Sequence, residues 1–164
     1  MEILAPHCER CEVAGSVRRQ KPEVGDIEVV CIPRRDVDLL CVPAGVCRGF
    51  IEVINRWEAV KGSPEGRYTQ CILPNTDGCR LDIFIADEVN WGWIFALRTG
   101  NDEFNQRVLL RALRAANFFA EDGYIYDYSD TLSPKKVSVP EEADLFRLLK
   151  IDFIKPVDRS LQGW

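Results

Sequence analysis

The sequence predicts an α/β (α+β) fold, with a mixed β-sheet in residues 1–97 and a smaller α+β lobe in residues 98–164. Two apolar runs, residues 26–32 and 80–86, have the length and composition of buried strands. Beyond residue 100, apolar side chains recur at helical spacing. The chain is therefore expected to join a sheet-based unit to a smaller mixed lobe.

The first part of the chain alternates strand and turn signals. Gly15-Ser16 is a turn that follows a short strand, and the Asp77-Gly78 pair is a strong hairpin signal between two apolar runs. The elements expected in order are a strand at 12–14, a strand at 26–32, a helix at about 46–60, a hairpin of 67–73 with 79–86, and a short helix at 91–96.

The second part of the chain begins with a helix-start signal. Asn101 or Asp102 can cap a helix that runs to about Asn117. A last helix is expected after Pro140, because acidic residues follow it and favour a helix N-terminus. Between these helices, short strands are expected at 124–128 and 136–139.

Composition limits the classes of protein. A chain of 164 residues with 46% hydrophobic content can form one domain, or one domain with a small lobe. No apolar run reaches the roughly 18 residues of a membrane span, and the acidic second residue argues against a signal peptide. The number of cysteines is odd and several lie in apolar runs, which favours a reducing cytoplasm: Cys8, Cys11, Cys31, Cys41, Cys47, Cys71 and Cys79. No signal for or against an oligomer is present.

The net charge of −5 limits the strength of any nucleic-acid binding. Such domains usually carry a basic surface, because phosphate contacts dominate affinity. Here a basic surface has to be local, and Arg107, Arg111 and Arg114 fall at helical spacing, with Lys135 and Lys136 as a further pair. We therefore expect weak, salt-sensitive DNA binding.

Three acidic residues form the candidate catalytic group. Asp26 and Glu28 alternate along one expected strand, so both side chains project from the same face. Asp82 lies in the second apolar run and joins them if the two strands pair. Three neighbouring carboxylates repel one another unless cations hold them, and two divalent ions about 3.5–4 Å apart serve displacement at phosphorus. The sequence thus predicts a two-metal site for nucleotidyl transfer.

Four motifs follow one another along the chain. They are Gly15-Ser16-Val17-Arg18-Arg19 with Asp26 and Glu28, Thr99-Gly100 with Phe104-Asn105, Val137-Ser138-Val139-Pro140-Glu141-Glu142, and Lys155-Pro156-Val157-Asp158-Arg159. In this order they resemble the motifs of the X family of DNA polymerases, the DNA polymerase beta-like nucleotidyltransferases. The resemblance covers nearly the whole chain and implies a nucleotidyltransferase palm over residues 1–97 and a nucleotide- and template-binding lobe over 98–164.

The resemblance implies a role for each site residue. Asp26 and Glu28 bridge two Mg²⁺ ions (Mn²⁺ being an alternative), and Asp82 holds the catalytic ion and helps to deprotonate the primer 3′-hydroxyl. Arg80 orients these carboxylates without binding a metal ion itself. The dNTP is bound by Gly15, Ser16, Arg19, Gly25, Gly100, Asp102 and Asn105. The implied activity is addition of a deoxynucleotide to a primer-template or gapped duplex, with release of pyrophosphate, as in DNA repair.

The sequence also departs from the family pattern. The second acid is Glu28 where these polymerases carry Asp, and Leu97-Arg98 stands where they carry Tyr-Phe. Val24 and Leu109 replace a polar and a basic residue. With fourteen residues before Gly15, we expect the helix-hairpin-helix modules and the lyase domain to be missing.

Two other functions stay open on these grounds. The acidic balance and the expected lack of duplex-binding modules favour a nucleotidyltransferase that acts on a non-DNA acceptor. Glu28 and the Leu97-Arg98 pair favour a catalytically silent nucleic-acid-binding subunit. Cys8 and Cys11 have the Cys-x-x-Cys spacing of zinc ligands, but no second such pair follows and Cys41 with Cys47 is poorly spaced, so structural zinc is not predicted.

Overall fold

The computed structural model describes residues 1–38 and 43–160, so Cys41 lies outside the described residues. The chain forms two compact units, and each is treated by itself. Unit 1 contains Met1–Val17 and Pro22–Ala86; unit 2 contains Arg18–Lys21 and the chain from Asp87 onward. The boundary expected at residues 97 and 98 falls inside a helix of unit 2. No helix in the described ranges is long and apolar enough to cross a bilayer.

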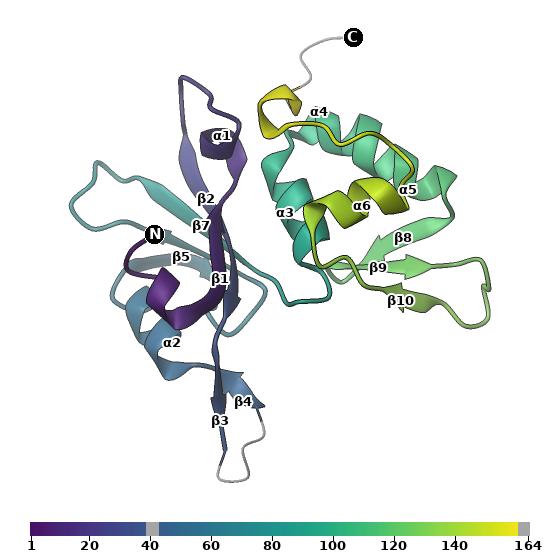
Figure 1. The fold of residues 1–164 in the computed structure, drawn as a ribbon. Helices are drawn as coiled ribbons and strands as arrows, with labels where there is room; N and C mark the ends of the chain where they lie inside the picture. The colour runs from purple at the N-terminus through teal and green to yellow at the C-terminus, as the bar shows by residue number, and fades with distance from the viewer. Residues whose placement is uncertain (39–42, 161–164) are drawn as a thin grey trace. The chain divides into compact units, whose positions relative to one another are not determined.

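A five-stranded mixed sheet is the centre of unit 1 (Figure 1). The two apolar runs form β2 and β7, which pair with each other in parallel, and every other strand pair of this sheet is antiparallel. In spatial order the strands are β1 (Cys8–Val13), β2 (Asp26–Pro33), β7 (Arg80–Ile85), β6 (Tyr68–Ile72) and β5 (Glu58–Gly62). The predicted hairpin is present as β6 and β7.

The core of unit 1 lies on one face of this sheet. Val29 and Ile83 point to that face from paired positions on β2 and β7 and are almost fully buried. α2 (Arg48–Ile54) covers the same face with Phe50 and Val53. Because side chains alternate along a strand, the residues between these apolar positions project from the opposite face.

The predicted helix at 46–60 is too long. α2 ends at Ile54, and the chain turns through Asn55 into β5, which pairs with β6. All five residues of β5 are exposed, so this edge strand carries no alternation of apolar and polar side chains to mark it.

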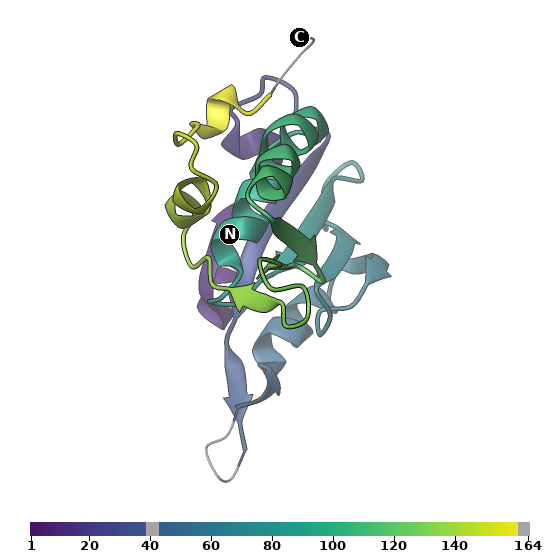
Figure 2. The same ribbon diagram turned by 90° about the vertical axis from the view of Figure 1, so that its right-hand side faces the viewer.

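The remaining elements of unit 1 are short. A hairpin of β3 (Arg35–Val37) and β4 (Pro43–Val46) projects from the sheet (Figures 1 and 2). The others are η1 (Ala5–His7) and α1 (Gly15–Arg18).

Unit 2 combines helices with a three-stranded antiparallel sheet in the order β10-β9-β8. Its first helix, α3 (Trp91–Thr99), packs against α6 (Glu142–Leu148). The other elements are α4 (Asp102–Phe104), η2 (Asn105–Leu110), α5 (Arg111–Ala115), β8 (Phe118–Glu121), β9 (Tyr124–Asp127), β10 (Lys135–Val137) and η3 (Pro156–Asp158).

Helix caps in unit 2 follow the local sequence. The Asn101 side chain accepts a hydrogen bond from the Phe104 amide at 2.9 Å, as its cap position predicted. The helix that follows contains one turn of π-helix, η2, before α5. At the start of α6, Glu141 and Asp144 form a capping box.

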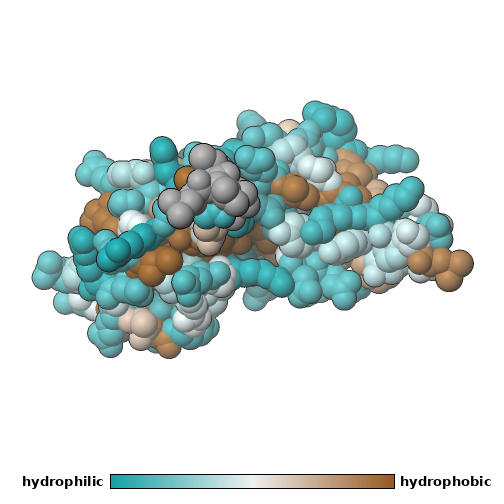
Figure 3. All heavy atoms as spheres, turned by 90° about the horizontal axis from the view of Figure 1, so that it is seen from below, coloured by the Kyte–Doolittle hydropathy of each residue, from teal (hydrophilic) through white to brown (hydrophobic). Residues whose placement is uncertain are grey.

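Together the two units confirm the predicted α+β class. The surface is mainly hydrophilic in the view from below, with apolar residues in separate small groups (Figure 3). Exposed large apolar side chains such as Ile3, Val60, Phe119 and Leu132 come from different elements of the chain.

We predict that Gly92→Ala destabilises unit 2. A Cβ at this position in α3 would overlap the backbone carbonyl of Glu141, which cannot swing aside as a side chain can. Alanine favours a helix by about 1 kcal/mol over glycine, whereas overpacking costs about 1–3 kcal/mol. A lower free energy of unfolding, measured by urea denaturation, is therefore expected.

Gly25→Ala is the control, because nothing lies within 4 Å of a Cβ at Gly25. An unchanged or raised free energy of unfolding for Gly92→Ala would contradict the packing described for α3 and α6.

Candidate functional site

The face of the sheet opposite α2 carries the predicted acidic residues. In the parallel pairing of β2 with β7, Asp26 is opposite Arg80 and Glu28 is opposite Asp82. Paired positions on adjacent strands project from the same face, so all four side chains leave the sheet on one side. The structure thus brings Glu28 and Asp82 onto neighbouring strands at the same level.

Asp82 is buried, with 6% of its surface exposed, and two donors hold its carboxylate. The Tyr68 hydroxyl and Gln70 Nε2, the latter at 2.8 Å, both donate to Asp82 Oδ1. Both donors lie on β6, where Gln70 is opposite Asp82. Burial, and to a smaller degree the nearby Asp82 carboxylate, raises the pKa of the Cys71 thiol to about 11. The side chain of Asp82 is therefore held at one oxygen by neutral donors.

Glu28 extends toward the turn that starts α1. A Cβ on Gly15 would overlap Glu28 Oε2, and Gly15 has a φ of +59°, which glycine adopts without strain. The Gly15 position thus leaves room for the carboxylate of the longer acid. Sequence reasoning gave Gly15 a role toward phosphate and missed this contact.

The other predicted residues of unit 1 come from α1, from the start of β2 and from the start of β7. Asp26 is half-buried and Gly25, just before it, is exposed. Ser16 Oγ is buried and has no hydrogen-bond partner among the residues that the structure describes. Arg80 is exposed at the first position of β7.

The donor set on this face suits a hard divalent cation. Carboxylate oxygens are the ligands that Mg²⁺ and Mn²⁺ prefer, whereas thiolates select softer ions. In the described ranges, the donor atoms that lie within 4.8 Å of one another belong to three cysteines, Cys8, Cys11 and Cys31. The carboxylate oxygens of Asp26, Glu28 and Asp82 do not form such a close group. Mutual repulsion of three ionised carboxylates favours such a separation.

Three predicted nucleotide-binding residues lie in unit 2, after α3. Asn105 Nδ2 donates to the carbonyls of Leu97 at 2.8 Å and Gly100 at 3.4 Å, so its side chain closes the turn between α3 and α4. A Cβ on Gly100 would contact Asn105 Oδ1 at 2.5 Å. Asn105 Oδ1 is buried without a partner in the described residues, and Asp102 is exposed.

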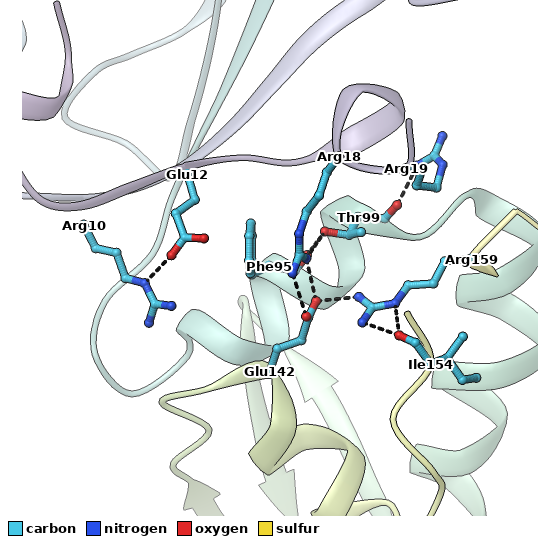
Figure 4. A network of polar contacts seen from close by, with 9 residues as sticks. All are labelled: Arg10, Glu12, Arg18, Arg19, Phe95, Thr99, Glu142, Ile154 and Arg159. Atoms are coloured by element: carbon cyan, nitrogen blue, oxygen red, sulfur yellow. Dashed lines mark hydrogen bonds and ion pairs between the residues drawn. The ribbon is translucent and has the colours of Figure 1, made fainter. Parts of the chain in front are cut away.

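Arg18 and Arg19 are bound to other residues of unit 2 (Figure 4). Arg18 donates to both carboxylate oxygens of Glu142 at 2.8 Å and stacks 3.7 Å from the Phe95 ring centre. Arg19 donates to the Thr99 carbonyl at 2.6 Å, while its Nε is buried without a partner in the described chain.

Glu142 is the centre of this network. Fully buried Arg159 donates to Glu142 Oε1 at 2.5 Å and to the Ile154 carbonyl at 2.8 Å (Figure 4). Burial opposes ionisation of Glu142, but the hydrogen bonds and charges of Arg18 and Arg159 outweigh it and lower the pKa of this carboxyl. Sequence reasoning placed Glu142 at a helix start and within a family motif, and missed this role.

The family model described as DNA polymerase beta thumb matches residues 95–160, from α3 to just beyond η3. The match suggests a polymerase-related, DNA-binding role for this part of the chain and a relation, over that part, to the X-family polymerases. It also suggests use of a divalent metal ion. No curated protein matches the chain.

We predict that Glu142→Gln costs about 3 kcal/mol of unfolding free energy at pH 7, because it leaves fully buried Arg159 and half-buried Arg18 without a counter-charge. The folded-state pKa of Glu142 is lowered, so its contribution is complete above the ordinary value of 4.5 and is lost as pH falls through the folded value. The difference from wild type should therefore be complete above pH 4.5 and shrink as the pH falls below it.

Urea denaturation at several pH values measures this difference. Glu121→Gln, at the exposed end of β8, is the control for loss of one negative charge. If the free energies of unfolding of wild type and Glu142→Gln differ by the same amount at pH 7 and below pH 4.5, the ionised network is ruled out.

Proposed function

We propose that the chain is a nucleotidyltransferase of the X-family polymerase type, which adds a deoxynucleotide to a primer 3′-hydroxyl and releases pyrophosphate. The observation that carries the proposal is the register of β2 with β7, in which Glu28 is opposite Asp82 on the acidic face. The DNA polymerase beta thumb match over residues 95–160 supports it from a separate part of the chain.

In this proposal Asp26, Glu28 and Asp82 hold two Mg²⁺ ions, which supply charge neutralisation at the phosphates and acidify the attacking hydroxyl. Asp82 accepts from Tyr68 and Gln70 through Oδ1, so these donors fix its orientation. Asp82 is also the residue that takes part in deprotonating the primer hydroxyl. Arg80, on the same face opposite Asp26, positions the carboxylates.

Unpartnered polar atoms support binding of a dNTP. Ser16 Oγ, Arg19 Nε and Asn105 Oδ1 are buried and lack partners in the described ranges, and buried polar groups normally have one. Exposed Gly25 leaves its backbone open to a phosphate, and Asp102 is exposed as well. Gly100 contributes to dNTP binding indirectly, because its lack of a side chain leaves room for the Asn105 side chain.

DNA binding is proposed for unit 2. Arg107, Arg111 and Arg114 are all exposed along η2 and α5, within the segment that matches the thumb. Arg107 also forms an ion pair with Glu103 at 3.0 Å, and this pairing weakens the attraction of Arg107 for a phosphate. With a net charge of −5, the binding should be weak and should fall steeply with salt. Free thiols on the described cysteines support a reducing, cytoplasmic location.

Primer extension on a gapped duplex with Mg²⁺ or Mn²⁺ and each dNTP tests the proposal. Templated addition supports a DNA polymerase. Activity only on another acceptor would indicate a nucleotidyltransferase with a non-DNA substrate. An absence of turnover on every acceptor would leave a silent nucleic-acid-binding subunit.

We predict that Asp82→Asn lowers the rate of addition by at least about 1,000-fold, because neutralising a metal-binding carboxylate removes transition-state stabilisation. Asp77→Asn makes the same chemical change in the exposed turn between β6 and β7 and should retain full activity. Equal rates for Asp82→Asn and wild type in single-turnover assays would refute the assignment.

We further predict that Tyr68→Phe lowers kcat about 10- to 100-fold and changes KM for dNTP little, because the Tyr68 hydroxyl donates to Asp82 and its proposed role is to orient that carboxylate. Steady-state kinetics with a gapped duplex separate the two constants. A raised KM with unchanged kcat would show that Tyr68 acts in substrate binding instead.

A further inference from the structure

Three cysteine thiols gather on the face of the sheet opposite the acidic residues. The Sγ atoms of Cys8, Cys11 and Cys31 all lie within 4.8 Å of one another. Cys11 and Cys31 are directly paired on β1 and β2, with their Sγ atoms 3.1 Å apart. Cys31 is three residues from Glu28 on β2, so it projects from the other face of the sheet.

A β-bulge places Cys8 in this group. Residues three apart on a regular strand point to opposite faces, so Cys8 and Cys11 should diverge. The pairing of β1 with β2 shifts by one residue between Cys8 and Arg10: Cys8 is opposite Pro33, whereas Arg10 is opposite Ile32. The extra residue, Glu9, turns Cys8 back onto the face of Cys11, as bulges re-aim side chains next to functional sites.

The separation of the sulfur atoms is close to that of a metal-thiolate centre. Tetrahedral Zn²⁺ with bonds of about 2.3 Å needs sulfur atoms about 3.8 Å apart. Small shifts of three side chains reach this value from the present positions. Cys8 and Cys31 are buried, whereas Cys11 is partly exposed and provides the path by which an ion enters.

Other groups around the thiols also suit a cation held by thiolates. Met1 Sδ lies 3.9 Å from Cys11 Sγ and adds a soft donor on the exposed side. Arg34 Nε donates to the Cys8 carbonyl at 3.3 Å, and its positive charge favours the thiolate forms that a bound ion requires. Cys47 is nearby, but its thiol donates to the His7 carbonyl at 3.5 Å.

We propose that Cys8, Cys11 and Cys31 bind one Zn²⁺ ion, with the fourth position taken by water or by the Met1 thioether. The ion fastens the edge strand β1, through both of its cysteines, to β2 (Figure 1). This site is independent of the proposed nucleotidyl transfer, because it uses soft ligands on the other face of the sheet. Each thiol loses its proton to solvent when the ion binds.

The test uses the full chain, reduced and stripped of metal, and titrated with Zn²⁺ against a chromophoric chelator. We expect one ion per chain and a higher Tm with Zn²⁺. Co²⁺ in place of Zn²⁺ should give sulfur-to-metal charge-transfer absorption in the near ultraviolet, a readout that needs no variant. Cys11→Ser should weaken Zn²⁺ binding by more than about 100-fold. The loss of a direct ligand should exceed the loss of about 10- to 100-fold that follows mutation of a residue that only hydrogen-bonds to a ligand.

Cys79→Ser is the matched control, because Cys79 is partly exposed and lies outside the cluster. Asp82→Asn should bind Zn²⁺ like wild type, which separates this site from the acidic face. Co²⁺ spectra without thiolate absorption, or equal affinity of Cys11→Ser and wild type, would overturn the proposal. So would a Cys11–Cys31 disulfide that forms in air and persists with excess Zn²⁺.

Discussion

The parallel pairing of β2 with β7 is the constraint on which unit 1 depends. It sets Glu28 opposite Asp82 and, one position on, Val29 opposite Ile83. Because side chains alternate along each strand, one register fixes an acidic face and an apolar face together. A slip of one residue would bury carboxylates against α2 and expose the core, so apolar burial holds the acidic residues in place. The chemistry of one face is thus secured by the packing of the other.

Strands with strong local signals could be predicted from the sequence. The apolar runs marked β2 and β7, and the Asp77-Gly78 turn marked the hairpin of β6 with β7, whereas the parallel direction of the β2–β7 pair was not predicted. Edge strand β5 was missed because all five of its residues are exposed and its pairing with β6 is not a local property. The same segment was assigned to a helix, which in fact ends at Ile54.

Contacts between distant residues could not be predicted in the same way. Gln70 in a buried strand was a signal for a polar partner, but only the register of β6 with β7 identifies Asp82 as that partner. Cys31 is twenty residues from Cys11 along the chain. Cys8 joins these two cysteines through a β-bulge that the local sequence pattern does not predict. Glu142 was similarly hidden, because its partner Arg18 is 124 residues away.

Gly15 and Glu28 form a coupled pair of positions. The glycine lacks the one atom that would collide with the glutamate carboxylate. The positive φ of +59° strains any side chain at the first position, so glycine is required there whichever acid stands at the second. The exchange of aspartate for glutamate at position 28 is therefore free to occur only while position 15 stays glycine, and the longer carboxylate then fills the space that the glycine leaves.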